Sequence, residues 1–273
     1  MKKAILSLLL LAGFLAAPAT RADVPVLTDV SALNTVPDRD TAYRHRDFQA
    51  YLPLKTVSER LKVGNYSSFE NPTGIHFQAG EKAVITLTGT PRQPVTLIVH
   101  NFERAGGHET HELAPGRNEL SIGTAGLAYV DYRDNNPGTA SPVHLDIEGG
   151  KVNGLFSHTD TNEVWEYLLD HAVCGVLDIV GERCQLVYDV DDLRKGCPKE
   201  GREMLALYDR IISLEQHMLG WDQFKCHPGN HIMGRVQWQG FMHADSLGAV
   251  FVYQAIPQLT NPAELQMQAW PVA

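Results

Sequence analysis

The feature that most constrains the fold is a period-two alternation of apolar and polar residues between about residues 66 and 150. Strand-like runs alternate there with turns rich in Gly, Pro and Asn, and the runs are 75–77, 84–88, 95–99, 127–132 and 143–147. Short strands at this spacing are typical of antiparallel β-sandwiches. We therefore expect a β-sandwich lobe over residues 51–155, preceded by a polar leader or linker over residues 23–50.

Beyond this lobe the apolar residues follow a helical period. One apolar stripe covers residues 164–172, and a second predicted helix covers about residues 200–218. A strand is expected at 185–188, and the N-cap pattern at 261–264 starts a third helix. The sequence thus predicts an α+β chain, with an antiparallel β-sandwich lobe followed by a mostly helical region over residues 156–273.

Residues 1–22 have the pattern of a secretory signal peptide. Lys2 and Lys3 precede an apolar stretch at residues 4–16, and small residues follow up to Ala22. This apolar stretch is shorter than the roughly 20 residues that a membrane-spanning helix needs. We expect a cleaved signal peptide, a secreted or periplasmic protein, and no membrane-spanning segment.

The charge balance is acidic, with 32 Asp and Glu residues against 23 Lys and Arg residues. The formal net charge is −9 at pH 7. Because an acidic surface repels a phosphate backbone, we expect no nucleic-acid partner.

The four cysteines all lie in the second half of the chain, and they are Cys174, Cys184, Cys197 and Cys226. An even number of cysteines in an exported chain favours disulfides. Four cysteines allow three pairings, and the sequence does not choose among them. A zinc site is the alternative, since His227 and His231 follow Cys226 closely.

No complete catalytic motif is present. A zinc peptidase needs two histidines one helical turn apart with a glutamate between them, and the sequence has no H-E-x-x-H. The runs 108–112 and 227–231 hold two histidines each but have the wrong spacing or contain Pro and Gly, so we interpret both as loops. There is no G-x-S-x-G and no glycine-rich phosphate loop either. We predict no catalytic residue and no metal ligand.

Several runs together resemble one family. They are ENPTGIHF (70–77), AGE (79–81), GRNEL (116–120), GLAYV (126–130), LALYD (205–209), GFMHA (240–244) and WPVA (270–273). In this order they are similar to segments of the enhancin-like, mucin-degrading zinc metallopeptidases, over about residues 50–273.

The resemblance implies a thermolysin-like (gluzincin) catalytic region after the β-sandwich lobe, zinc as cofactor, and peptide or glycoprotein substrates such as mucins. It also implies that a sheet-edge strand aligns the substrate backbone. The best candidate for that strand is residues 234–238, with Arg235, Val236, Gln237 and Trp238 as substrate-binding residues.

The same resemblance places the family's two zinc histidines, base and distal ligand beyond Ala273. The catalytic region is therefore expected to be incomplete, and we expect this chain by itself to be inactive. The alternative is a non-catalytic secreted β-sandwich module that binds glycans or glycoproteins through exposed aromatic residues. Candidates for those aromatic residues are Phe102, Tyr129 and Tyr132.

Overall fold

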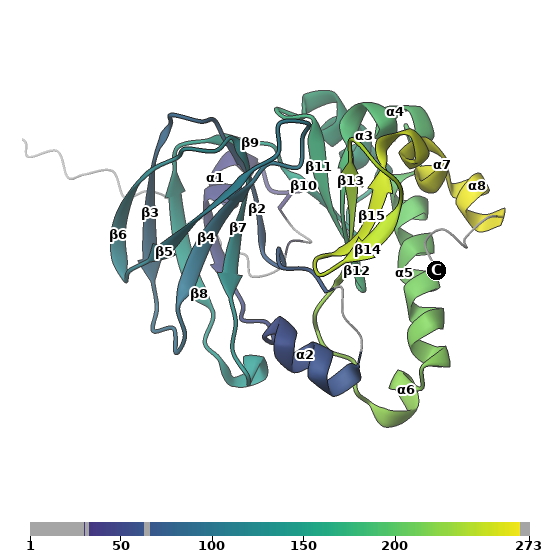
Figure 1. Ribbon diagram of the computed structural model, residues 1–273. Coiled ribbons are helices and arrows are strands. Elements are labelled where there is room, and N and C mark those ends of the chain that lie inside the picture. The colour runs from purple at the N-terminus through teal and green to yellow at the C-terminus, as the bar shows by residue number, and fades with distance from the viewer. Residues whose placement is uncertain (1–29, 31–32, 63–65, 268–273) are drawn as a thin grey trace, which may run out of the picture.

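A computed structural model describes residue 30, residues 33–62 and residues 66–267 of the chain (Figure 1). The predicted signal peptide at residues 1–22 and the run at 270–273 lie outside these described residues. Helices and strands are both abundant, and the strands form three sheets. The prediction of a mixed chain with antiparallel sheets is confirmed. None of the described helices is long and apolar enough to cross a membrane.

Two antiparallel sheets and their connections form what we call the two-sheet lobe, residues 39–152 (Figure 1). One sheet has the order β1-β8-β3-β6, with β1 (His45–Phe48), β3 (Lys82–Thr88), β6 (Gly116–Ser121) and β8 (Val143–Glu148). The other has the order β5-β4-β7-β2-β9, with β2 (Pro72–Phe77), β4 (Val95–His100), β5 (His108–Leu113), β7 (Gly126–Tyr132) and β9 (Lys151–Val152). Alternate side chains of both sheets, such as Ile85 and Leu97, meet in one apolar core. The lobe therefore closes its own core.

Part of the predicted leader belongs to this lobe. Residues of the 23–50 segment form α1 (Arg39–Arg44) and β1, and β1 pairs antiparallel with β8. Only Arg46 and Phe48 of β1 are buried, and the first of these is charged. Because polar residues dominate the strand, its period-two pattern did not stand out. A further helix, α2 (Leu54–Leu61), and a short 3-10 turn, η2 (Pro137–Thr139), complete the lobe.

The second region, residues 155–267, was predicted to be mostly helical, and the structure adds to its helices a mixed six-stranded sheet that the prediction missed. We call it the third sheet; its order is β10-β11-β12-β13-β15-β14, with β10 (Leu155–Ser157), β11 (Val176–Val180), β12 (Cys184–Asp189), β13 (Ile232–Gln237), β14 (His243–Asp245) and β15 (Gly248–Val252). Strand β11 is buried on both faces and shows no alternation. Strands β10 and β14 have three residues each, too few to show a period.

Helices cover the face of the third sheet that points away from the two-sheet lobe (Figure 1). The helices of this region are α3 (Asn162–His171), α4 (Val190–Gly196), α5 (Gly201–Met218), η3 (Tyr253–Ala255), α7 (Ile256–Thr260) and α8 (Pro262–Met267). A short helix, α6 (Trp221–Phe224), follows α5, and its Trp221 packs against Val57 and Tyr66 instead. The helices expected at 164–172 and 200–218 are present as α3 and α5. Their buried residues, including Trp165 and Leu205, share a core with the third sheet.

Buried hydrogen bonds join the two regions. Tyr129 of β7 donates its hydroxyl to the Asp178 carboxylate of β11, with an O–O distance of 2.9 Å. Asn153 follows β9, and its side chain donates to the Val176 carbonyl and accepts from the Val173 backbone. The side chains that make these hydrogen bonds are buried, since Tyr129 is 0% exposed and Asn153 is 2% exposed. The third sheet is therefore held firmly against the lobe.

Candidate functional site

The strand predicted to form the substrate-aligning edge is an inner strand. β13 pairs with β12 through residues 232–235 and with β15 through residues 234–237. The prediction that residues 234–238 form a sheet edge is therefore wrong. The edge strands of this sheet are β10 and β14, and β14, which pairs with β15 alone, is the one nearer to β13. Edge strands carry unpaired backbone groups, and these can bind an extended peptide.

Arg235 of β13 nevertheless reaches that edge. Its guanidinium donates to the Asp245 carboxylate of β14. Partial burial opposes ionisation of Asp245, but the hydrogen bond and positive charge of Arg235 hold the pKa of Asp245 below its usual range. Burial lowers the pKa of His100 to about 4, with the charges of His108 and Arg235 acting in the same direction. Arg235 is therefore a fixed positive charge between the lobe and the edge strand.

Gln237 positions the loop that leads into β14. Its Nε2 donates to the Phe241 carbonyl at 2.5 Å. The Phe241 side chain is 77% exposed, and its ring lies 5.8 Å from the His243 ring, centroid to centroid. Val236 is 4% exposed and packs into the core beside α5, because alternate residues of a strand face opposite ways. The predicted residue Val236 is thus a core residue.

Trp238 joins the edge to the two-sheet lobe. Its indole Nε1 donates to the Phe102 carbonyl at 2.9 Å. The Arg104 guanidinium carbon lies 4.9 Å from the centre of the Trp238 ring and 5.2 Å from that of Tyr253, within range of cation–π attraction. The loop after β4 therefore packs on the strands next to the edge. We call this surface the edge surface, defined by Arg235, Gln237, Trp238, Phe241, His243 and Asp245.

A cavity of about 510 Å³ opens elsewhere between the two regions, and Glu70 and His231 line it. His231 Nδ1 lies 2.6 Å from one Glu70 oxygen, and the His231 backbone N–H donates to the other oxygen at 2.9 Å. Burial opposes a charged imidazole, but the Glu70 carboxylate raises the pKa of His231 above its usual value. His231 is therefore engaged by Glu70, which does not fit a zinc site with Cys226.

The two runs with paired histidines have different outcomes. Residues 227–231 lie between α6 and β13 without regular structure, as predicted. The run 108–112 was expected to be a loop, but it lies in strand β5 and pairs with β4. His108 and His111 are three residues apart on that strand, so they face opposite sides and do not converge on one ion.

All four predicted disulfide cysteines are free, so the structure contradicts their pairing. Each thiol has its own surroundings. Cys184 lies on β12 near Asp209, and Cys197 ends α4, and both are fully buried. Cys174 and Cys226 are partly buried in separate loops. Burial raises the pKa of Cys174 and of Cys197 to about 12, so these two thiols are protonated and poor nucleophiles.

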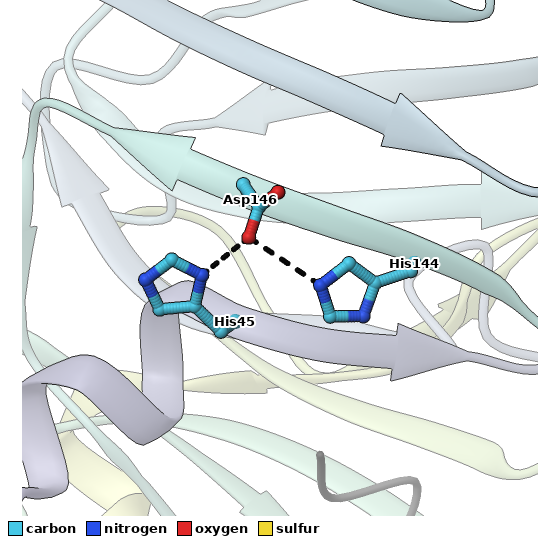
Figure 2. Close-up of side chains that lie close together, drawn as sticks. All are labelled: His45, His144 and Asp146. Atoms are coloured by element: carbon cyan, nitrogen blue, oxygen red, sulfur yellow. Dashed lines mark hydrogen bonds and ion pairs between the residues drawn. The ribbon is translucent and has the colours of Figure 1, made fainter. Parts of the chain in front are cut away.

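One group that the sequence analysis did not single out is His45, His144 and Asp146, on the outer face of the two-sheet lobe (Figure 2). The signal for it is a repeated H-x-D, at residues 45–47 and 144–146. The first copy fell in the predicted leader, and strand pairing brings it beside the second.

No protein-family model matches the chain, and no curated protein matches it. Solved structures do. A metallopeptidase in complex with Tn antigen has a TM-score of 0.76 and 23% identity, covering 84% of this chain and 45% of that chain. A metallopeptidase from Bacteroides thetaiotaomicron has a TM-score of 0.75 and 22% identity, covering 88% of this chain and 43% of that chain. The chain has the fold of these metallopeptidases.

This likeness confirms, at the level of the fold, the resemblance found in the sequence. The catalytic module of the metalloprotease ZmpA from Clostridium perfringens has a TM-score of 0.69 and 17% identity, covering 80% of this chain and 50% of that module. The chain therefore spans no more than about half the length of these three structures.

Proposed function

We propose that this chain is the amino-terminal part of the catalytic region of an exported, enhancin-like zinc metallopeptidase that acts on O-glycosylated proteins such as mucins. The observation that carries the proposal is the fold likeness to a metallopeptidase in complex with Tn antigen, over 84% of the chain. A second neighbour, the M60 catalytic domain of ZmpC from Clostridium perfringens, is in complex with the sialyl T antigen. In this proposal, the two-sheet lobe is the β-sandwich and the second region begins a thermolysin-like catalytic region.

The edge surface is the proposed substrate-binding part of this chain. Strand β14 offers unpaired backbone groups to an extended peptide. Phe241 supplies an exposed aromatic ring beside it, which suits the apolar face of a sugar. Arg235 holds β14 in place through Asp245, and Gln237 holds the loop. These residues position the edge, and β14 makes the proposed contact.

The residues present do not fit the family's catalytic zinc. Such a site needs two histidines one helical turn apart with a glutamate between them. The two long helices α3 and α5 carry one histidine each, His171 and His217, near their C-terminal ends. The His45, His144 and Asp146 group lies on strands of the lobe, away from the edge surface. We therefore derive no hydrolytic step, and this chain alone is proposed to be inactive.

The test uses residues 23–273 and a short O-glycopeptide that carries a single Tn sugar. Calorimetry is expected to show binding, and mass spectrometry is expected to show an intact peptide. Phe241→Ser should weaken binding about tenfold by removing the aromatic contact. Phe224→Ser is the matched control, because Phe224 is 72% exposed but lies on α6.

Two results would go against the proposal. Cleavage of the glycopeptide by this chain would contradict its inactivity. Equal loss of binding in Phe241→Ser and Phe224→Ser would show that β14 is not the binding site. Binding that survives Phe241→Ser and maps to the two-sheet lobe would instead favour the non-catalytic glycan-binding module.

A further inference from the structure

Two copies of the tripeptide pattern H-x-D lie side by side in the two-sheet lobe. β1 carries His45 and Asp47, and β8 carries His144 and Asp146. In the antiparallel register, His45 stands opposite Asp146 and Asp47 stands opposite His144. The residue between each pair, Arg46 or Leu145, is buried. Because side chains alternate along a strand, the two histidines and two aspartates form a square on the outer face of the sheet.

The donor atoms of this square are close enough to share one ion. One ligand atom from each of His45, His144 and Asp146 lies within 4.8 Å of the others. Both imidazole rings point at the same carboxylate oxygen of Asp146 (Figure 2). His144 Nε2 is 3.4 Å from that oxygen. Bonds of about 2.0 Å to a tetrahedral zinc ion place two ligands about 3.3 Å apart, so this separation matches.

Asp47 prepares His144 for this role. Its carboxylate oxygen lies 2.7 Å from His144 Nδ1 and accepts that N–H. A carboxylate at one ring nitrogen leaves the lone pair of the other nitrogen free to bind a metal. The Nε2 lone pair then faces the Asp146 oxygen, and both atoms are acceptors. Such a contact is favourable only when a proton or a cation lies between them.

The square is accessible and has the charge of a divalent cation site. Two neutral imidazoles and two carboxylates carry a charge of about −2, which a divalent ion neutralises. The His45 and His144 side chains are each 24% exposed. A surface cavity of about 500 Å³ opens beside His45 and Asp146. The neighbouring cation, Arg44, is held by Asp40 at 2.8 Å and by the Gly149 carbonyl at 2.6 Å.

We infer that this square binds one zinc ion, with His45, His144 and Asp146 as ligands and Asp47 orienting His144. The His45 ring now contacts Asp146 directly, so it withdraws slightly when the ion enters. Imidazole and carboxylate donors suit zinc among the divalent ions. The ion joins β1 to β8 and thereby fastens β1 to its sheet. Zinc bound there stabilises the folded chain without any role in hydrolysis.

The test titrates zinc chloride into the full chain, purified without a histidine tag and treated with a chelator. We expect one ion per chain in calorimetry and a higher Tm with zinc than without it. His144→Gln and His45→Gln should each abolish the one-to-one isotherm and the zinc-dependent rise in Tm. Asp47→Asn should weaken zinc binding about tenfold, as loss of an orienting carboxylate does.

A matched control exists at α6, where His217 and His227 flank Asp222. Their rings contact different oxygens of Asp222, at 2.9 and 2.6 Å. In the described part of the chain, only His45, His144 and Asp146 bring three such ligand atoms within 4.8 Å of one another. His227→Gln should therefore leave zinc binding unchanged.

Three outcomes overturn the inference: no zinc binding to the parent chain, binding that survives both His45→Gln and His144→Gln, or binding lost in His227→Gln. An unchanged Tm in the absence of metal verifies that each variant is folded. Because the proposed glycopeptide binding at the edge surface does not involve this square, failure of the zinc inference leaves the proposed function intact.

Discussion

The two-sheet lobe and the second region differ in how completely they cover their apolar residues. Among the described residues, the large apolar side chains that stand exposed all lie after residue 160. Met218 at 79%, Phe224 at 72% and Leu214 at 55% lie along the outer side of α5 and on α6. Most apolar side chains of the two lobe sheets lie in one shared core, whereas Phe69, Phe102, Leu127 and Tyr129 pack into the core of the second region.

This difference indicates that the lobe is self-sufficient and that the second region depends on it. Three lobe residues, Tyr129, Phe69 and Phe102, pack into the hydrophobic core of the second region.

The largest effect is expected from Trp165→Ala, which opens a cavity in the second region. Trp165 is fully buried, and its Nε1 donates to the Cys197 carbonyl at 2.7 Å. We expect a loss of about 3–5 kcal/mol in the free energy of unfolding, measured by urea denaturation. Limited proteolysis should then cut after residue 155 first and leave the lobe intact.

The reverse variant is Phe48→Ala in the core of the lobe, where Phe48 is 1% exposed. Because residues of the lobe contribute to the core of the second region, this variant should make both regions accessible to protease. If Trp165→Ala also releases the lobe, the two regions fold as one unit and the contrast fails.

The next effect concerns the joint between the regions. Burial raises the pKa of Asp178 from 3.8 to about 7, while the Tyr129 hydrogen bond opposes this rise. A carboxyl with a raised folded-state pKa favours folding below its unfolded value, and this stabilisation is lost as the pH rises through about 7. Asp178→Asn should therefore raise the stability at pH 8 by up to about 4 kcal/mol and change little at pH 4.

The measurement for Asp178 is the free energy of unfolding at several pH values between 4 and 8. The parent chain should lose stability across this interval more steeply than the variant. Parallel curves for the two proteins would show that Asp178 is not the titrating group.

A smaller effect is expected from Glu70→Gln, which weakens the second tie between the regions. Burial opposes a charged His231, yet the Glu70 carboxylate raises its pKa above 6.5. The stabilisation is complete below the unfolded value and is lost as pH rises through the raised value. The variant should cost about 2 kcal/mol near pH 6 and less near pH 9, measured by thermal or urea unfolding.

The comparison for Glu70 is Asp222→Asn, which removes an exposed partner of His227. Surface ion pairs contribute little, so this change should cost clearly less stability than Glu70→Gln. An equal cost for the two variants would mean that burial of the Glu70 pair adds nothing.

The smallest effect on stability is expected on the exposed face of α5. Leu214→Ser with Met218→Ser should change the free energy of unfolding by less than about 0.5 kcal/mol each and should reduce self-association in sedimentation. Leu205→Ser, on the buried face of the same helix, should cost several times more. A large loss in the double variant would show that this face is already covered within the chain.

Local pattern predicted those strands and helices whose two faces differ. The runs 84–88, 95–99 and 143–147 alternate because one side meets the core and the other meets solvent, and they appear as β3, β4 and β8. β11 has no polar side and carries no such signal. The two buried residues of β1 are an arginine and a phenylalanine, so the strand does not show an alternation of apolar and polar residues.

Properties of the site that depend on contacts between residues far apart in the sequence could not be predicted. Residues 232–237 form a strand, close to the expectation, but strand order alone decides that it is an inner one. His45 and Asp146 are brought together across 101 residues. The disulfide prediction rested on the compartment and the cysteine count, which say nothing about the distance between thiols.

The position of Trp238 at the contact between the regions has an optical consequence. All four tryptophans, Trp165, Trp221, Trp238 and Trp270, lie in the second half of the sequence, whereas the two-sheet lobe contains tyrosine and phenylalanine only. Indole emission therefore reports on the second region and, through Trp238, on its docking to Phe102. Tyrosine absorbance carries most of the signal from the lobe. Four further tyrosines, Tyr167, Tyr188, Tyr208 and Tyr253, lie in the second region, so only the indole signal is confined to one half of the molecule. Indole emission of an unlabelled sample therefore follows the opening of the second region during unfolding.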